Sequence, residues 1–262
     1  MESELLMKRK LIFLLFIFIL GFFSSIVFAD ELIVENPKIE VGNAQVVNAA
    51  IEISFGDITI SGGATKLLEG EFRYFSYDWK PSISYQVKNS VGELKVEIST
   101  NINFPFFNFK DKDYISLIRL NNFIPMNLFI KVGAGRSQLD LTSMALETLI
   151  VESGVGEVNI DLEGNTSISR LNVKTGLGKT TIDLRGSWEK NVDAKISSGV
   201  GEVTVLLPQK IGVKIETEKG LGEIDATNLT VNGNIYTNQL YGKTSSTLNI
   251  YLEWGIGKVN LY

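Results

Sequence analysis

A short glycine phrase recurs through this chain and constrains its fold more than any other feature. Its form is Gly-x-Gly, a charged residue, then alternating apolar positions, as in SGVGEVNIDL at 153–162 and TGLGKTTIDL at 175–184. Successive copies lie 21, 22, 23, 21 and 35 residues apart. Such a period is typical of solenoids, in which each unit buries its apolar face only against its neighbours. The first glycines of the copies are Gly133, Gly154, Gly176, Gly199, Gly220 and Gly255.

Each copy has the alternation of a β-strand, interrupted once. In the copy at 171–184, Leu171 and Val173 alternate with polar residues before the glycines. After the glycines, Ile182 and Leu184 continue the alternation one position out of step. Period two with one apolar face indicates half-buried strands, and glycine tolerates the bend that absorbs the slip. The sequence therefore predicts an all-β fold, a single-stranded, right-handed, β-helix-like β-solenoid of about eight rungs with Gly-x-Gly repeats of about 21–23 residues.

A charged residue follows the second glycine in every copy. In a parallel stack, equivalent residues lie roughly 4.8 Å apart from rung to rung. Because the signs mostly alternate, we interpret this row as a ladder of ion pairs that fixes the register, and a charged binding stripe is the alternative. The residues are Arg136, Glu157, Lys179, Glu202, Glu223 and Lys258.

The N-terminal half carries degenerate copies of the phrase. One lies at 51–60 with Gly56 as its second glycine, and another at 90–98 with Gly92 in that place. The sequence predicts a β region over residues 30–127 with inserted hairpins, and regular repeats over residues 128–262. One continuous domain is expected to span residues 46–262. The polar segment 228–247 interrupts the last interval, and the chain stops on a strand at Tyr262. An open edge there must be covered by that segment or by a partner.

The first 29 residues have the pattern of an export segment. Basic residues at 8–10 precede an apolar run at 11–23, and small residues follow up to Ala29. This order is typical of a secretory signal peptide, and the run is also about long enough to remain as an anchor. We therefore expect an extracytoplasmic protein, secreted or anchored by this segment.

Aromatic residues gather in two N-terminal insertions. Such clusters cap a core, or they stack on sugars and sit at lipid interfaces. The candidates for ligand contact are Tyr74, Tyr77, Trp79, Phe106 and Phe107.

Catalytic chemistry has little support in the sequence. The chain has no histidine and no cysteine, which removes Ser-His-Asp sites, Cys-His sites and most zinc sites. Three aspartates recur at the ends of copies, Asp140, Asp161 and Asp183. They are exposed residues near turns, a calcium site, or an acid–base pair for glycan cleavage. We expect no cofactor, and the net charge of −5 argues against a nucleic-acid partner.

The export segment, the stretch FGDITISGGATKLLEGEF at 55–72 and the glycine rungs together resemble bacterial envelope proteins of the toast-rack and putative-adhesin type. The chain is also similar to the C-terminal domains of cell-wall-active-antibiotic response proteins. The resemblance covers roughly residues 46–262. It implies a β-solenoid outside the cytoplasmic membrane with an interaction or stress-sensing role, and it supplies no catalytic residues.

The expected function is therefore a non-enzymatic, extracytoplasmic binding or scaffold domain. Its expected partners are an envelope glycan, a lipid or a membrane protein. Two alternatives stay open: a calcium-dependent polysaccharide-processing enzyme that uses the aspartate row, and a surface solenoid that self-assembles as a homo-oligomer through the edge at Tyr262.

Overall fold

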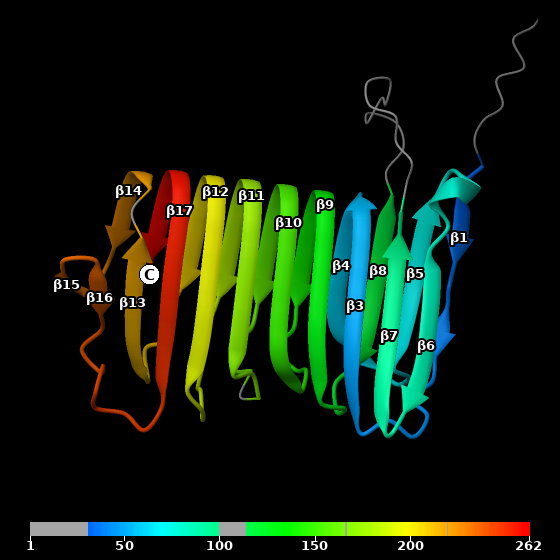
Figure 1. Cartoon of the computed structure of the whole chain (residues 1–262), viewed down its shortest axis with the longest axis horizontal. Coiled ribbons are helices and arrows are strands. Elements are labelled where there is room, and N and C mark those ends of the chain that lie inside the picture. Colours follow the sequence, from blue (N-terminus) through cyan, green and yellow to red (C-terminus); the bar gives the residue numbers. More distant parts are fainter. Residues whose placement is uncertain (1–30, 100–113, 166, 219) are drawn as a thin grey trace, which may run out of the picture. The chain divides into compact units, whose positions relative to one another are not determined.

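The computed structural model describes residues 31–99, 114–165, 167–218 and 220–262. Residues Leu32–Tyr262 form one compact unit, and its secondary structure is almost entirely β (Figure 1). The predicted all-β solenoid is confirmed. Among the described residues, no helix has the length and apolar character needed to cross a membrane. The regular rungs are β9 (Met126–Asp140), β10 (Leu146–Asp161), β11 (Arg170–Asp183), β12 (Val192–Leu206) and β17 (Thr247–Leu261).

Each regular rung is one long strand that bends at its Gly-x-Gly. Neighbouring rungs pair in parallel and in register, so that Gly156 lies opposite Gly135 on one side and Gly178 on the other. The bend divides each strand between two facing sheets, which we call the front sheet (halves before the glycines) and the back sheet (halves after them). In Figure 1 the chain rises in the front sheet, crosses at the upper edge, descends behind and advances from right to left through β9 to β12, which is a right-handed winding.

The core lies between the two sheets. Columns of aliphatic side chains run from rung to rung, as Ile130, Val151, Val173 and Ile196 do in the front sheet, each 1% exposed or less. Full burial of one such side chain contributes about 1.5–3 kcal/mol. The outward positions between them are polar or half-buried, which is the alternation that the sequence predicted.

The C-terminal strand does not lie at the end of the stack. β17 pairs in parallel with β12 on one side, and with β13 (Gly212–Glu218) and β14 (Leu221–Ala226) on the other. The prediction that the strand ending at Tyr262 forms the open edge is therefore wrong. Self-assembly itself stays a prediction, and the outer strand of the back sheet at this end is β14.

The polar segment after residue 228 covers part of this end. β16 (Ile235–Thr237) pairs antiparallel with β13, and β15 (Thr230–Asn232) pairs with β16. Asn238 adds to this cover, since its side chain accepts from the amide of Val213 at 3.0 Å and donates to the carbonyl of Ile211 at 2.8 Å. The inserted segment thus covers part of the front-sheet edge, one of the two arrangements that the sequence allowed.

Chain order is also rearranged at the N-terminal end. A rung made of β3 (Val46–Phe55) and β4 (Asp57–Ala64), with its bend at Gly56, pairs with β9. On its other side lie β7 (Val91–Ile98) and β8 (Ile115–Asn121), which come later in the sequence. Gly92 therefore stands near the start of a front-sheet strand rather than at a bend, and its prediction as a rung glycine is wrong.

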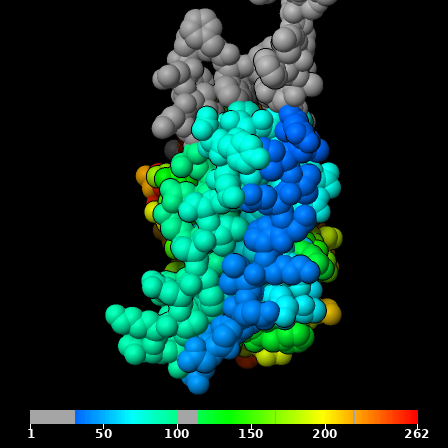
Figure 2. Space-filling model, turned by 90° about the vertical axis from the view of Figure 1, so that its right-hand side faces the viewer, coloured from blue at the N-terminus to red at the C-terminus, as the bar shows by residue number. Residues whose placement is uncertain are grey.

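Four antiparallel strands cap this end. β5 (Leu68–Tyr74) pairs with β8 and carries β1 (Ile33–Glu35) and β2 (Lys38–Ile39), while β6 (Ser82–Lys88) pairs with β7. Figure 2 shows the blue N-terminal strands and the blue-green β6 side by side over the end of the stack. A short 3₁₀ helix, η1 (Tyr77–Trp79), joins β5 to β6. The proposed boundary at residue 127 stays a prediction.

Candidate functional site

The charged row after the glycines is a register ladder. Arg136 lies 3.7 Å from Asp57 and 3.6 Å from Glu157, measured between charged atoms, and Lys179 lies 3.7 Å from Glu202. Because β17 is inserted, Lys258 lies between Glu202 and Glu223, so the signs alternate along the whole row. Each exposed pair contributes about 0–1 kcal/mol. We therefore assign the row a structural role.

A groove opens on the outer face of the front sheet near the N-terminal end. It has a volume of about 660 Å³ and crosses β6, β7, β3, β9 and β10. Its floor follows one outward row, in which Ala50 lies opposite Lys95 on one side and Phe129 on the other, with Ile150 next to Phe129. The row is hollow at Ala50 because a methyl group stands between two long side chains.

A polar row borders this floor. Asn48 donates to Glu93 at 2.9 Å, and Asn127 donates to the side-chain oxygen of Asn48 at 3.0 Å. Thr148 continues the row on β10. The groove thus sets an aromatic and aliphatic strip beside a line of amides, a hydroxyl and a carboxylate, an arrangement that can bind a ligand with one apolar and one hydroxylated face.

Lys95 contributes an ammonium group to the groove that is paired with two carboxylates. Its ammonium lies 2.8 Å from Glu97 and 3.8 Å from Glu52. The hydrogen bond to Glu97 and the charges of both carboxylates raise the pKa of Lys95 above its ordinary value. The side chain therefore stays protonated at neutral pH.

Each of the three recurring aspartates, Asp140, Asp161 and Asp183, is the last residue of a strand. Asp140 accepts from Thr142, Asp161 from the amide of Glu163 at 3.0 Å, and Asp183 from the amide of Arg185 at 3.0 Å. These bonds between residues two apart stabilise the turn that follows each strand. Three carboxylates come within 4.8 Å of one another, and we call them the acidic cluster: Asp161, Glu163 and Asp183. Asp140 is not among them, and the sequence had not indicated Glu163.

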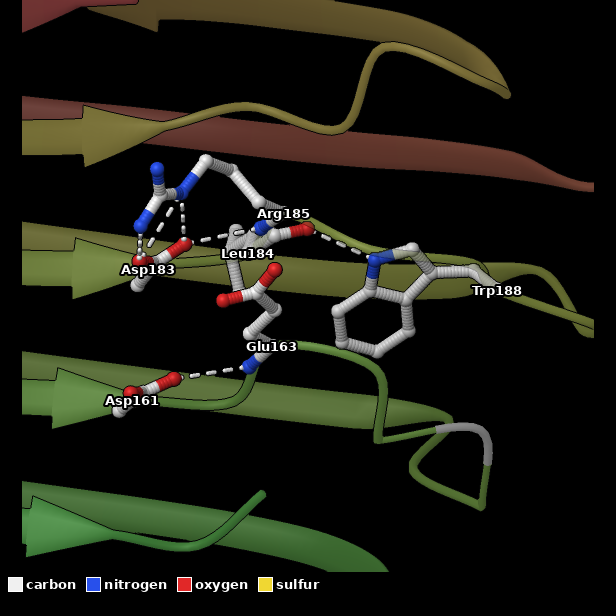
Figure 3. A network of polar contacts seen from close by, with 6 residues as sticks. All are labelled: Asp161, Glu163, Asp183, Leu184, Arg185 and Trp188. Carbon is white, nitrogen blue, oxygen red and sulfur yellow. Dashed lines mark hydrogen bonds and ion pairs between the residues drawn. The ribbon is translucent and has the colours of Figure 1, made fainter.

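The acidic cluster is already neutralised in part (Figure 3). The Arg185 guanidinium donates through Nε to both oxygens of Asp183, at 2.9 and 3.1 Å, and Trp188 donates to the carbonyl of Leu184 at 2.7 Å. Burial raises the pKa of Asp183, but the hydrogen bonds and charge of Arg185 outweigh it and hold the pKa below its ordinary value. A cation here would have to displace an ion pair, so this geometry favours a structural role.

The aromatic candidates separate by exposure. Tyr74 is fully buried and stacks on Tyr114, with ring centroids 5.8 Å apart. Trp79 is 8% exposed and packs edge-on against Phe55 at 5.0 Å. Both rings therefore cap the core, and a ligand in solvent cannot reach the ring of Tyr74. Tyr77 is 78% exposed, and Phe106 and Phe107 lie outside the described residues.

Sequence reasoning missed the groove because its residues come from five separate strands. The detectable sign is that Ala50, Phe129 and Ile150 occupy outward positions, where other rungs carry polar residues such as Asn172 and Lys195. A search for apolar residues on the outward phase would have found the strip. It would not have shown that Lys95 and Ala50 share its row, because that depends on the rearranged order of β3 and β7.

A family model and one solved structure agree with the fold. A family model for the N-terminal domain of toast_rack, DUF2154, matches residues 28–169 and 164–206. A putative cell adhesion protein from Clostridium sporogenes is 32% identical, with a TM-score of 0.69 over 88% of this chain and 99% of that one. A putative adhesin from Bacteroides fragilis is 14% identical, with a TM-score of 0.34 over 89% and 98%. A search of curated proteins finds no match.

Proposed function

The chain belongs to the toast-rack family, and on that premise we propose that it is a non-enzymatic, adhesin-like domain that binds glycan at the cell envelope. The binding surface is the groove on the front sheet. The domain acts outside the cytoplasmic membrane, where its N-terminal export segment directs it or anchors it.

Two lines support this assignment. The relative from Clostridium sporogenes, 32% identical over nearly its whole length, is described as a putative cell adhesion protein. The chain also carries the basic and apolar N-terminal pattern of an exported protein at residues 8–29. Neither line names a ligand, so the ligand class must come from the groove.

The observation that carries the glycan proposal is the pairing of rows in the groove. A sugar ring presents an apolar face that stacks on an aromatic ring and hydroxyl groups that pair with amides and carboxylates. Phe129 offers the ring, and the neighbouring Asn48, Asn127 and Glu93 offer donors and acceptors. The groove is open along the sheet, so a chain of sugars could lie across several rungs.

The test measures co-sedimentation of residues 30–262 with isolated envelopes, untreated or stripped of protein by protease. We expect binding to both preparations and about a 5-fold loss of affinity in Phe129→Ala, which corresponds to the roughly 1 kcal/mol of one aromatic contact. Tyr251→Ala is the matched control, because Tyr251 occupies the same outward row outside the groove. Binding to untreated envelopes alone would identify a protein partner, and release of sugar product would identify an enzyme; either result would overturn the proposal.

A further inference from the structure

A continuous apolar row runs along the bend edge of the solenoid. From β10 to β14, the residue between the two glycines of each rung points outward, and its neighbours in the row are its strand partners in adjacent rungs. We call this row the apolar ridge: Val155 (50% exposed), Leu177 (50%), Val200 (42%), Ile256 (54%) and Leu221 (72%).

Folding does not require apolar side chains at these positions. The bend depends on the flanking glycines, and the side chain between them contributes little to the core because 42–72% of the residue is exposed. Single exposed apolar residues are normal on proteins, but contiguous apolar patches mark surfaces that contact something. The ridge therefore indicates an interaction that the solenoid itself does not provide.

The described chain begins at this same edge. Ile33 pairs with Tyr74, and the ring of Tyr74 stacks on Tyr114. Ile115, the residue after Tyr114, pairs with Asp57, which directly follows the bend at Gly56. Leu32 lies one residue before this pair and is 47% exposed. Figure 1 shows the start of β1 and η1 at the upper edge, where the rungs bend. The apolar run 11–23 of the export segment therefore precedes, in the sequence, a residue at the ridge edge.

The charges beside the ridge are balanced. On the back-sheet side they are the register ladder, whose three basic and four acidic members alternate in sign from Asp57 to Glu223. On the front-sheet side a second row holds two basic and three acidic residues, Lys131, Glu152, Lys174, Glu253 and Glu218. Two nearly neutral rows do not attract a polyanion, and they leave the apolar side chains as the source of affinity. Exposed Tyr77 at the same edge is a residue type that favours the membrane–water interface.

We propose that the apolar ridge rests on a lipid bilayer, so that the solenoid stands edge-on at the membrane surface. Val, Leu and Ile side chains enter the headgroup boundary, as the apolar face of an interfacial helix does. This inference rests on the proposed location at the envelope, and it uses a surface separate from the groove. In this orientation the outer face of the front sheet stands roughly perpendicular to the membrane, and the groove on that face stays open to solvent.

The first test uses residues 30–262, because the core formed by the described residues lies between Ile33 and Leu261. The protein is mixed with phosphatidylcholine vesicles, with and without one quarter phosphatidylglycerol, and floated on a density gradient. We expect flotation with both compositions and at least a 10-fold loss in the triple variant Leu177→Ser, Leu221→Ser and Ile256→Ser. Phe123→Ser is the control, because Phe123 is 88% exposed in the loop between β8 and β9, at the opposite edge.

A second test avoids dependence on the triple variant. The chain has no cysteine, so Leu177→Cys and Phe123→Cys each accept one environment-sensitive dye. Vesicles should raise and blue-shift the emission of the dye at residue 177 and leave the dye at residue 123 unchanged. Equal responses at both positions, or no flotation of the parent domain, would overturn the proposal.

Two further outcomes separate the lipid proposal from self-association and from the glycan proposal. If the parent forms concentration-dependent dimers that the triple variant abolishes, and it ignores vesicles, the ridge is an interface between copies of this chain. If vesicles bind and Phe129→Ala binds them as the parent does, while glycan binding is absent, the lipid proposal stands and the glycan proposal fails. The two proposals therefore fail separately.

Discussion

Placing a methyl group in the glycine column should destabilise the solenoid through close approach rather than through backbone conformation alone. At Gly178, φ is +135°. Cβ atoms in proteins essentially never come closer than 3.0 Å to another heavy atom, and a Cβ added at Gly178 would lie more than 1 Å closer than that to the carbonyl oxygen of Gly156. At Gly176 the φ is ordinary, but an added Cβ would also come closer than 3.0 Å to the Gly154 oxygen. At Gly164, φ is +71° and the space is open. The three sites separate the two effects.

The expected costs differ accordingly. Gly164→Ala should lower the free energy of unfolding only because alanine is disfavoured in the left-handed backbone conformation, at a cost of about 1–2 kcal/mol. The less flexible unfolded chain of the alanine variant offsets part of this cost. Gly176→Ala must push two strands apart and weaken one or two ladder bonds, at about 1 kcal/mol each. Gly178→Ala combines displacement with a φ that L residues rarely adopt, and should cost about 3–5 kcal/mol in total.

Urea unfolding followed by circular dichroism measures the free energy of unfolding of each variant. The order Gly178→Ala, then Gly176→Ala, then Gly164→Ala is expected, with equal slopes if the same surface unfolds. If Gly178→Ala costs no more than Gly164→Ala, the rungs do not approach as closely as the structure shows and the reasoning is refuted.

Three further predictions test the strand order, the ion pair and the acidic cluster. The double variant Ser197→Cys/Glu253→Cys should form a disulfide on oxidation, because these residues are strand partners in β12 and β17. The control Ser197→Cys/Glu218→Cys should not form one, because β17 lies between β12 and β13. The opposite result would show that the rungs stack in the order of the sequence. Asp183, whose pKa is lowered when folded, stabilises the fold above its unfolded pKa of about 3.9 and loses this contribution as the pH falls through the folded value. Urea unfolding should therefore show a cost of Asp183→Asn at pH 7 that shrinks below pH 3.9, and an equal cost throughout would contradict a role for the Arg185 pair. Calcium at 1 mM should raise the Tm by less than about 1 °C because that pair occupies the acidic cluster, and a larger, saturable rise would establish a metal site.

Local pattern alone predicted much of this protein. The period-two alternation identified the strands, and the slip at each glycine pair identified the bend, because a side chain on a strand faces either the core or solvent. The charged residue after Gly-x-Gly predicted the ladder. These features depend on residues within one rung or on equivalent residues of neighbouring rungs, so the sequence alone predicts them.

The order of rungs was decided only by the tertiary structure. Every rung presents nearly the same columns of aliphatic residues and glycines, so any two can pair in parallel at similar cost, and the alternation does not say which do. β17 between β12 and β14 places Lys258 between Glu202 and Glu223, which chain order would have left side by side. The groove depends on the same kind of choice, since Ala50 meets Lys95 only because β7 lies outside β3. A repeated sequence determines the shape of its unit, and long-range pairing among equivalent units determines their neighbours.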